Sequence, residues 1–162
     1  MHLSSTAALA FLPFASVIGL WVAWSDLKFM KIPNRAVFAL ALCFAVVGIV
    51  VLPFGEYLWR WSHLAVVLAI GFVLNLLRMI GAGDAKYAAA MAPFIPLGDA
   101  IWFMLLFCAI LPASFFIHRG ARMLPPVRKA APDWVSWDSR KFPMGLALGP
   151  VLAIYLVFAA VS

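Results

Sequence analysis

Charge is scarce in this sequence. Only 11% of the 162 residues are charged and 67% are hydrophobic, whereas a soluble domain is roughly half apolar and about a quarter charged. Long apolar runs recur along the whole chain and leave no room for a separate soluble domain. The composition therefore excludes an ordinary soluble protein and predicts a single all-α integral membrane domain over residues 1–162.

Cysteine is also rare, and several motifs of hydrolytic enzymes are missing. Cys43 and Cys108 lie inside apolar runs, with no CxxC pair or other metal-type spacing. The HExxH motif of zinc proteases and the GxSxG elbow of serine hydrolases are both absent. His63 and His118 have no obvious serine or cysteine partner. We therefore expect neither a metal nor a cofactor.

The net charge of +6 would suggest nucleic-acid binding in a soluble protein. Here the basic residues lie in short segments between apolar runs, where they can determine membrane topology instead. We expect membrane lipids, and no nucleic acid, as partners of this chain.

Apolar stretches of about 20 residues are long enough to cross a bilayer as helices. Five meet that length: residues 4–24, 35–54, 60–80, 99–118 and 143–161. A sixth, residues 84–95, is shorter and reaches only about 18 Å as a helix. The first stretch has no basic leading region and no convincing cleavage site, so we interpret it as a retained helix and not as a signal peptide. The sequence predicts a bundle of about six transmembrane helices.

The basic residues are distributed very unevenly between the two predicted sides. One side carries eleven of the twelve: Lys28, Lys31, Arg35, Arg78, Lys86, Arg119, Arg122, Arg128, Lys129, Arg140 and Lys141. The other side has only Arg60. Because basic loops stay in the cytoplasm, we expect the N-terminus and the C-terminus outside and a cytoplasmic basic loop at 118–142. Trp134 and Trp137 in this loop are expected in the interfacial aromatic belt, with a grip on acidic lipid or substrate as the alternative.

Six acidic residues remain to be explained. Glu56 and Asp99 fall in predicted turns on the outer side, and Asp133 and Asp138 lie in the basic loop beside arginines. Only Asp26 and Asp84 need another account.

Asp26 stands at the inner end of the first predicted span, in "SDLKFMKIPN". An ordinary interfacial carboxylate near Lys28 and Lys31 is the simplest interpretation of its position. The segment Ile32-Pro33-Asn34 then indicates a sharp turn, because proline disfavours the helical conformation at the residue before it and asparagine suits a helix cap.

Asp84 lies in "RMIGAGDAKYAAAMAP", between two long apolar stretches. Gly81 and Gly83 permit a non-helical backbone there, so Asp84 can be a helix N-cap. The following helix is short, however, so the carboxylate can also lie in or near the bilayer, where such groups usually serve a function. Lys86 is two residues on and points to another helix face. The alanines at 88–90 give a thin helix that another helix or a peptide can approach.

Two aspartates at one membrane face suggest an aspartic-protease arrangement. If their carboxyls come close together, both cannot ionise, so one holds a proton while the other acts as a base on a water molecule. The proton belongs to the coupled pair, and the sequence assigns no fixed acid or base.

"GAGDAK" resembles the Gly-x-Gly-Asp-x-Lys motif of the type IV prepilin peptidases, which belong to the GxGD intramembrane aspartic proteases. "DLKFMKIPN" is similar to their other hallmark, an aspartate followed six residues later by Ile-Pro-Asn. "KFPMGLALGP" resembles the Pro-x-Gly start of their final helix. The two main motifs occur in the family's order, and the resemblance extends over nearly the whole chain.

The resemblance implies that Asp26 and Asp84 are the catalytic pair. Gly81, Gly83, Lys86, Ile32, Pro33 and Asn34 match the motifs and are expected to shape the site. The substrate would be a prepilin-like precursor, cut at the cytoplasmic face of the bacterial inner membrane just ahead of its hydrophobic segment. The larger enzymes of this family also carry an inserted region with paired CxxC motifs for N-methylation. This chain has no such region, and in this respect it resembles the short, peptidase-only branch that serves Flp or tight-adherence pili.

Two other functions remain open at this point. The aspartates could relay ions in a small transporter, or the chain could be an inactive pilus-assembly subunit. We expect Asn75 to form a hydrogen bond between two helices and Arg78 to contribute to membrane topology through its charge.

Overall fold

The computed structural model describes all 162 residues and contains helices but no strands. The α-helices are α1 (Ser5–Phe29), α2 (Asn34–Val51), α3 (Phe54–Leu76), α4 (Ala82–Met91), α5 (Ala100–Met123), α6 (Pro125–Ala130) and α7 (Gly145–Val161). Three single turns of 3-10 helix are η1 (Ala92–Phe94), η2 (Leu97–Asp99) and η3 (Val135–Trp137). The predicted all-α architecture is confirmed.

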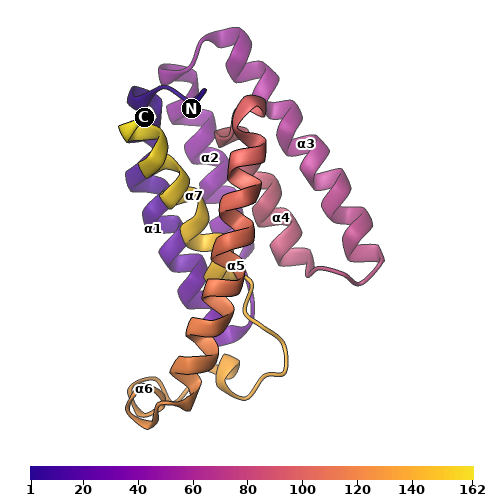
Figure 1. Cartoon of the computed structure of the whole chain (residues 1–162). Coiled ribbons are helices and arrows are strands. Elements are labelled where there is room, and N and C mark those ends of the chain that lie inside the picture. Colours follow the sequence, from indigo (N-terminus) through magenta and orange to yellow (C-terminus); the bar gives the residue numbers. More distant parts are fainter.

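The long helices run up and down the molecule and bring the first and last ones together (Figure 1). α1 and α7 pack against each other over much of their length. Glycines make this approach possible, because a Cβ built on Gly19 would lie 2.2 Å from the carbonyl oxygen of Gly149. Small residues at helix crossings let backbones come this close in membrane proteins. The α1–α7 pair is therefore the centre of the bundle.

Four helical segments are long and apolar enough to cross a membrane: α1, α2, α3 and the segment Leu97–Met123. α7 is also apolar but has only 17 residues. Large apolar side chains such as Phe72 and Ile101 are exposed on the outside of the bundle, as expected of surfaces that face lipid. The chain is a multi-pass membrane protein.

The predicted short helix after Asp84 is present, and it is shorter than expected. α4 has ten residues, which span about 15 Å. The 3-10 turns η1 and η2 then lead the chain to α5. α4 does not reach across a bilayer by itself.

Several predicted helix boundaries were wrong. The second helix ends at Val51 instead of residue 54, and the third begins at Phe54 instead of residue 60. Pro53 separates them, because a proline has no N–H to continue α2 and suits the entry to α3. α5 continues to Met123, past the expected end at 118, because Arg119 and Arg122 are as compatible with a helix as with a loop.

The end of the bundle that holds both termini contains a buried carboxylate. Asp99 is only 1% exposed and accepts hydrogen bonds from the backbone N–H of His2 at 2.9 Å and of Leu3 at 3.2 Å. The Tyr155 hydroxyl on α7 donates a third bond at 2.8 Å. Asp99 was predicted to be an ordinary turn residue on the outer side. This prediction is corrected, because the buried Asp99 carboxylate links the first residues of the chain to the last helix.

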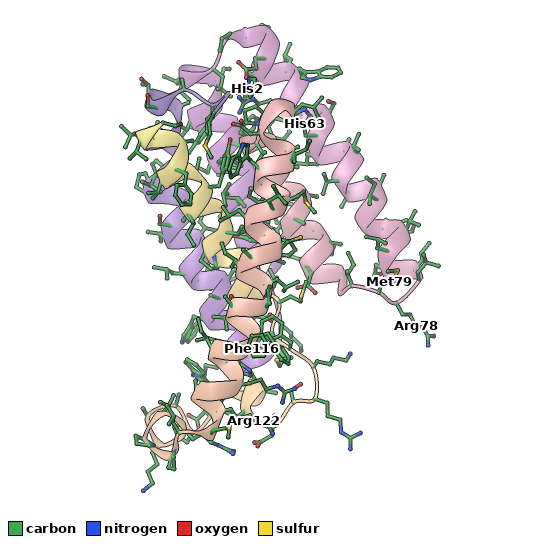
Figure 2. All side chains as sticks on the ribbon, viewed as in Figure 1. His2, His63, Arg78, Met79, Phe116 and Arg122 are labelled. Atoms are coloured by element: carbon green, nitrogen blue, oxygen red, sulfur yellow. The ribbon has the colours of Figure 1, made fainter.

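Arg60 is also buried at this end, with 1% of its surface exposed. It pairs with Glu56 one turn earlier on α3 and donates to the carbonyl oxygens of Pro93 and Phe94, at 3.4 and 3.3 Å. Its side chain therefore joins α3 to η1. Figure 2 shows His2 and His63 at this end of the molecule and Arg122 near the opposite one.

The segment 118–142 is partly structured and contains α6 and η3. Trp137 is 2% exposed, stacks on His118 with ring centroids 5.3 Å apart, and donates from Nε1 to the carbonyl oxygen of Ala131 at 2.8 Å. The prediction of an interfacial Trp137 was wrong, since this side chain anchors the segment to the end of α5. Asp138 pairs with Arg128 at 3.0 Å, as expected from its basic neighbours.

Candidate active site

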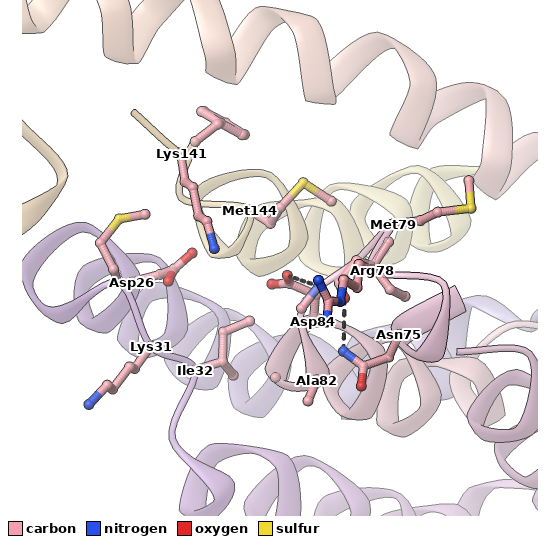
Figure 3. A pocket seen from close by; sticks show the side chains of 15 residues that line it. Asp26, Lys31, Ile32, Asn75, Arg78, Met79, Ala82, Asp84, Lys141 and Met144 are labelled. Carbon is pink, nitrogen blue, oxygen red and sulfur yellow. Dashed lines mark hydrogen bonds between the residues drawn. The ribbon is translucent and has the colours of Figure 1, made fainter. Parts of the chain in front are cut away.

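A cavity of about 720 Å³ opens at the end of the bundle opposite the termini. It lies where α1 ends, where α3 turns into α4 and where α7 begins. Figure 3 shows Asp26 and Asp84 in its lining, together with Asn75, Arg78, Lys141 and Met144. The two aspartates that the sequence singled out are 58 positions apart in the chain and face one cavity.

Asp26 is held in the last turn of α1. It is 5% exposed, and its Oδ2 accepts a hydrogen bond from the backbone N–H of Gly145 at 2.7 Å. Lys28 instead places its ammonium group over the rings of Trp24 and Phe29. The interpretation of Asp26 as an interfacial carboxylate near lysines was wrong, because the start of α7 covers it.

Gly145 is a site residue that the sequence did not identify by itself. A Cβ built on it would lie 2.7 Å from the Cβ of Asp26, closer than real Cβ atoms come. Only glycine lets the first N–H of α7 reach the carboxylate without displacing α1. The available signal was the segment "KFPMG", which marks a helix start but does not say what the helix covers.

Asp84 lies in the first turn of α4, three residues after the N-cap position, which Gly81 occupies. Its Oδ2 accepts a hydrogen bond from the Gly81 N–H at 3.2 Å. The predicted N-cap role was therefore wrong by three positions. The carboxylate still serves an unpaired N–H at the helix start, as acidic residues in a first turn do.

The electrostatic environment of Asp84 differs from that of an exposed aspartate. Asp84 lies outside the four candidate membrane spans. Burial, and next the negative charge of Asp26, raise its pKa to about 6, while the Gly81 hydrogen bond acts in the opposite direction. A carboxyl of this kind keeps its proton to a pH at which ordinary aspartates are ionised.

The two sequence motifs meet at the edge of the cavity. Lys86 donates from Nζ to the Asn34 side-chain oxygen at 3.5 Å, and a Cβ on Gly83 would lie 3.3 Å from the Cβ of Ile32. Pro33, not Asn34, occupies the N-cap position of α2. The expectation that Lys86 does not pair with Asp84 agrees with this contact. Gly83 and Lys86 thus join the start of α4 to the start of α2.

The alanines of α4 face other helices of the same chain. Ala89 and Ala90 are buried, and a Cβ on Gly71 of α3 would lie 2.9 Å from the Cβ of Ala85. The small residues of α4 are therefore covered by other helices, mainly α3 and also α2 and α7. The alternative of a peptide at this face is not supported.

The turn between α3 and α4 contributes two more cavity residues. Asn75 donates from Nδ2 to the carbonyl oxygen of Ile80 at 2.9 Å, so its bond closes this turn and does not join two helices as predicted. Arg78 has a left-handed backbone with φ of 58°. Both line the cavity with the aspartates, which the sequence did not reveal because turn geometry is not readable from composition.

The remaining candidates for chemistry lie elsewhere. His63 places Nδ1 3.2 Å from the Ile95 carbonyl oxygen, and His118 is stacked on Trp137. No three histidine, cysteine or acidic side chains come together as a possible metal site. Cys43 is buried and Cys108 exposed, and both are free thiols.

The fold and the cavity define a multi-pass membrane protein with a carboxylate-lined polar site at one end of its helix bundle. Residues 13–117 match the type IV leader peptidase family, so the chain belongs to that family and is a peptidase. The matched range includes Asp26 and Asp84 and ends before α6 and α7. No curated protein and no solved structure matched the chain.

Proposed function

We propose that this protein is a membrane-embedded aspartic endopeptidase that removes the leader peptide from prepilin-like precursors. One observation carries the proposal: Asp26 and Asp84 face the same cavity. Burial, and next the charge of Asp26, raise the pKa of Asp84. Aspartic proteases use two carboxyl groups of this kind, which share one site and of which one affects the ionisation of the other.

The reaction needs only the two carboxyls and a water molecule. The ionised carboxylate takes a proton from water, and the water oxygen attacks the scissile carbonyl carbon. The protonated carboxyl donates a hydrogen bond to the carbonyl oxygen and stabilises its developing charge. The C–N bond then breaks, the amine nitrogen takes a proton, and the pair returns to its singly protonated state.

Backbone groups hold the pair in place for this chemistry. Gly145 donates to Asp26 and Gly81 donates to Asp84, each from the start of a helix. Each bond leaves the other carboxyl oxygen available to water or substrate. Preorganised groups of this kind avoid reorganisation during the reaction.

The position of the cavity at one end of the apolar helices supports a precursor that is cut next to its hydrophobic segment. The cavity lies at the predicted cytoplasmic face, where Lys31, Arg78 and Lys141 also line it. An apolar helix of the substrate would stay in the bilayer while its leader enters the cavity. We therefore propose that the enzyme lies in the bacterial inner membrane, with its active site facing the cytoplasm.

The content of the loops supports one branch of the family. The segment 118–142 has no cysteine, and the chain has no CxxC motif. We therefore assign the protein to the peptidase-only branch that processes Flp or tight-adherence precursors.

Co-expression with a candidate Flp prepilin tests this function. We expect the wild type to yield a shorter product with a new N-terminus, read by gel mobility and N-terminal sequencing. Asp26→Asn and Asp84→Asn should each abolish cleavage, with a loss of at least about a thousandfold, because removing one member of a catalytic unit disables it.

Two other carboxylates provide matched controls. Asp133→Asn alters an exposed carboxylate in the basic loop and should leave cleavage intact. Asp99→Asn alters a buried one at the other end and should lower stability without removing activity from the folded fraction. Cleavage that persists in Asp26→Asn or Asp84→Asn would refute the aspartic mechanism. Ion transport without cleavage would favour a transporter, and neither activity would favour an assembly subunit.

A further inference from the structure

Methionine is concentrated around the cavity. Three of the seven methionines in the chain, Met30, Met79 and Met144, line it. They come from three different places in the fold: Met30 ends α1, Met79 lies in the turn before α4, and Met144 immediately precedes α7. Figure 3 shows Met144 and Met79 along one edge of the cavity, with Asp26 and Asp84 below them in that view.

The backbone adopts an unfavourable conformation at two residues of this site. Met30 has φ of 54° and Arg78, next to Met79, has φ of 58°, and no other residue in the chain has a positive φ. A left-handed backbone is unfavourable for a residue other than glycine. Glycine is the usual residue at the position that Met30 occupies after a helix. Both left-handed residues line the cavity, so the strain is confined to the candidate active site.

Methionine is suited to contacts with apolar groups of varying shape. Its unbranched side chain has three rotatable bonds and a polarisable sulfur, so it adapts to different partners. Here Ile32, Ile80 and Phe142 extend the apolar lining beside the carboxylates. Met79 is 69% exposed, which leaves its side chain free to move over a bound side chain.

We propose that Met30, Met79 and Met144 form an adaptable subsite for the first apolar side chain after the scissile bond. This inference rests on the proposed peptidase function and adds the substrate feature that the site recognises. The subsite accepts residues of different size, because its methionines rearrange around each of them. Specificity for one apolar residue is therefore weak.

Purified enzyme and a set of precursors with Phe, Leu, Val or Ala after the cleaved bond test the subsite. We expect kcat/KM of the wild type to vary by less than about tenfold across the set, because one or two methylene groups change binding in an apolar pocket only modestly. Met79→Ile replaces the exposed methionine by a branched, stiffer side chain of similar size. This variant should increase the ratio of kcat/KM between the Phe and Ala precursors by roughly tenfold or more.

Met144→Ile is a second variant, and Met104→Ile is the matched control. Met104 lies exposed on α5 and does not line the cavity, so its replacement should leave the spread unchanged. A wider spread in Met79→Ile or Met144→Ile, absent from Met104→Ile, supports the subsite. An unchanged spread in both folded variants overturns it, as does an equal loss for all four precursors. Failure of the wild type to cleave any precursor refutes the peptidase function itself.

Discussion

At the scale of single residues, the site depends on two aspartates whose surroundings differ. Asp26 is covered by the start of α7, whereas Asp84 lies half-buried in the first turn of α4. The sequence could identify both, because a carboxylate is rare in so apolar a chain. It could not identify Gly145, because glycine is common and its contact with Asp26 spans 119 positions.

The pKa of Asp84 predicts how cleavage depends on pH. The active pair holds one proton, and the pKa of Asp84, raised to about 6, lets the pair keep this proton to a higher pH than ordinary aspartates would. The singly protonated form is therefore lost on the alkaline side, as the pH rises through about 6. We expect kcat/KM to fall towards tenfold per pH unit on the alkaline side.

A series of kcat/KM measurements from pH 5 to 8 checks this dependence. Asp133→Asn should leave the alkaline limb in place, because this exposed carboxylate lies outside the cavity. A flat profile across the range would contradict the assignment of a shared proton to the pair.

At the scale of helices, length and hydrophobicity predicted the elements, and local chemistry determined their ends. The six apolar stretches all contain helices, but the break at Pro53 and the extension of α5 to Met123 were missed. Glu56 and Arg60 interrupt the apolar pattern, so Glu56 was expected in a turn and Arg60 at the outer end of the third span. In the structure they form an ion pair one turn apart at the start of α3. The helix therefore begins with a charged pair and not with an apolar segment.

The packing of α1 on α7 makes a prediction about two glycines. Gly149→Ala would place a Cβ 2.3 Å from the carbonyl oxygen of Gly19, and neither backbone can yield without separating the helices. We expect a loss of about 1 to 3 kcal/mol of stability, measured as a lower unfolding temperature in detergent. Gly145→Ala should mainly reduce cleavage, because its Cβ meets the side chain of Asp26.

Gly120→Ala is the control for both substitutions. Gly120 lies exposed on α5, and a Cβ there meets nothing within 4 Å. The same chemical change should raise stability by up to about 1 kcal/mol, because alanine favours a helix over glycine. If Gly149→Ala proved as stable as Gly120→Ala, the close α1–α7 crossing would be wrong.

At the scale of the whole molecule, the two termini lie together at one end, away from the end of α1 and the start of α4, which carry the candidate site (Figure 1). Asp99 binds the backbone of His2 and Leu3 and the hydroxyl of Tyr155 on the last helix. This network holds the start and the end of the chain together, so both termini must lie on one side of the membrane. The sequence predicted this arrangement from the basic loops, but it could not foresee the buried bonds, which need three distant segments to meet.

The side on which the termini lie is a prediction that reporter fusions can test. Because eleven of the twelve basic residues lie towards the cavity end, we expect that end in the cytoplasm. Alkaline phosphatase fused after Ser162 should be active and a fluorescent protein there should be dark, whereas fusions within 118–142 should behave in the opposite way. A reporter ahead of Met1 should agree with the one after Ser162, since Asp99 joins the two ends. Fluorescence at the C-terminus would place the aspartates outside and remove the cytoplasmic route for a precursor, whatever the cleavage assays give.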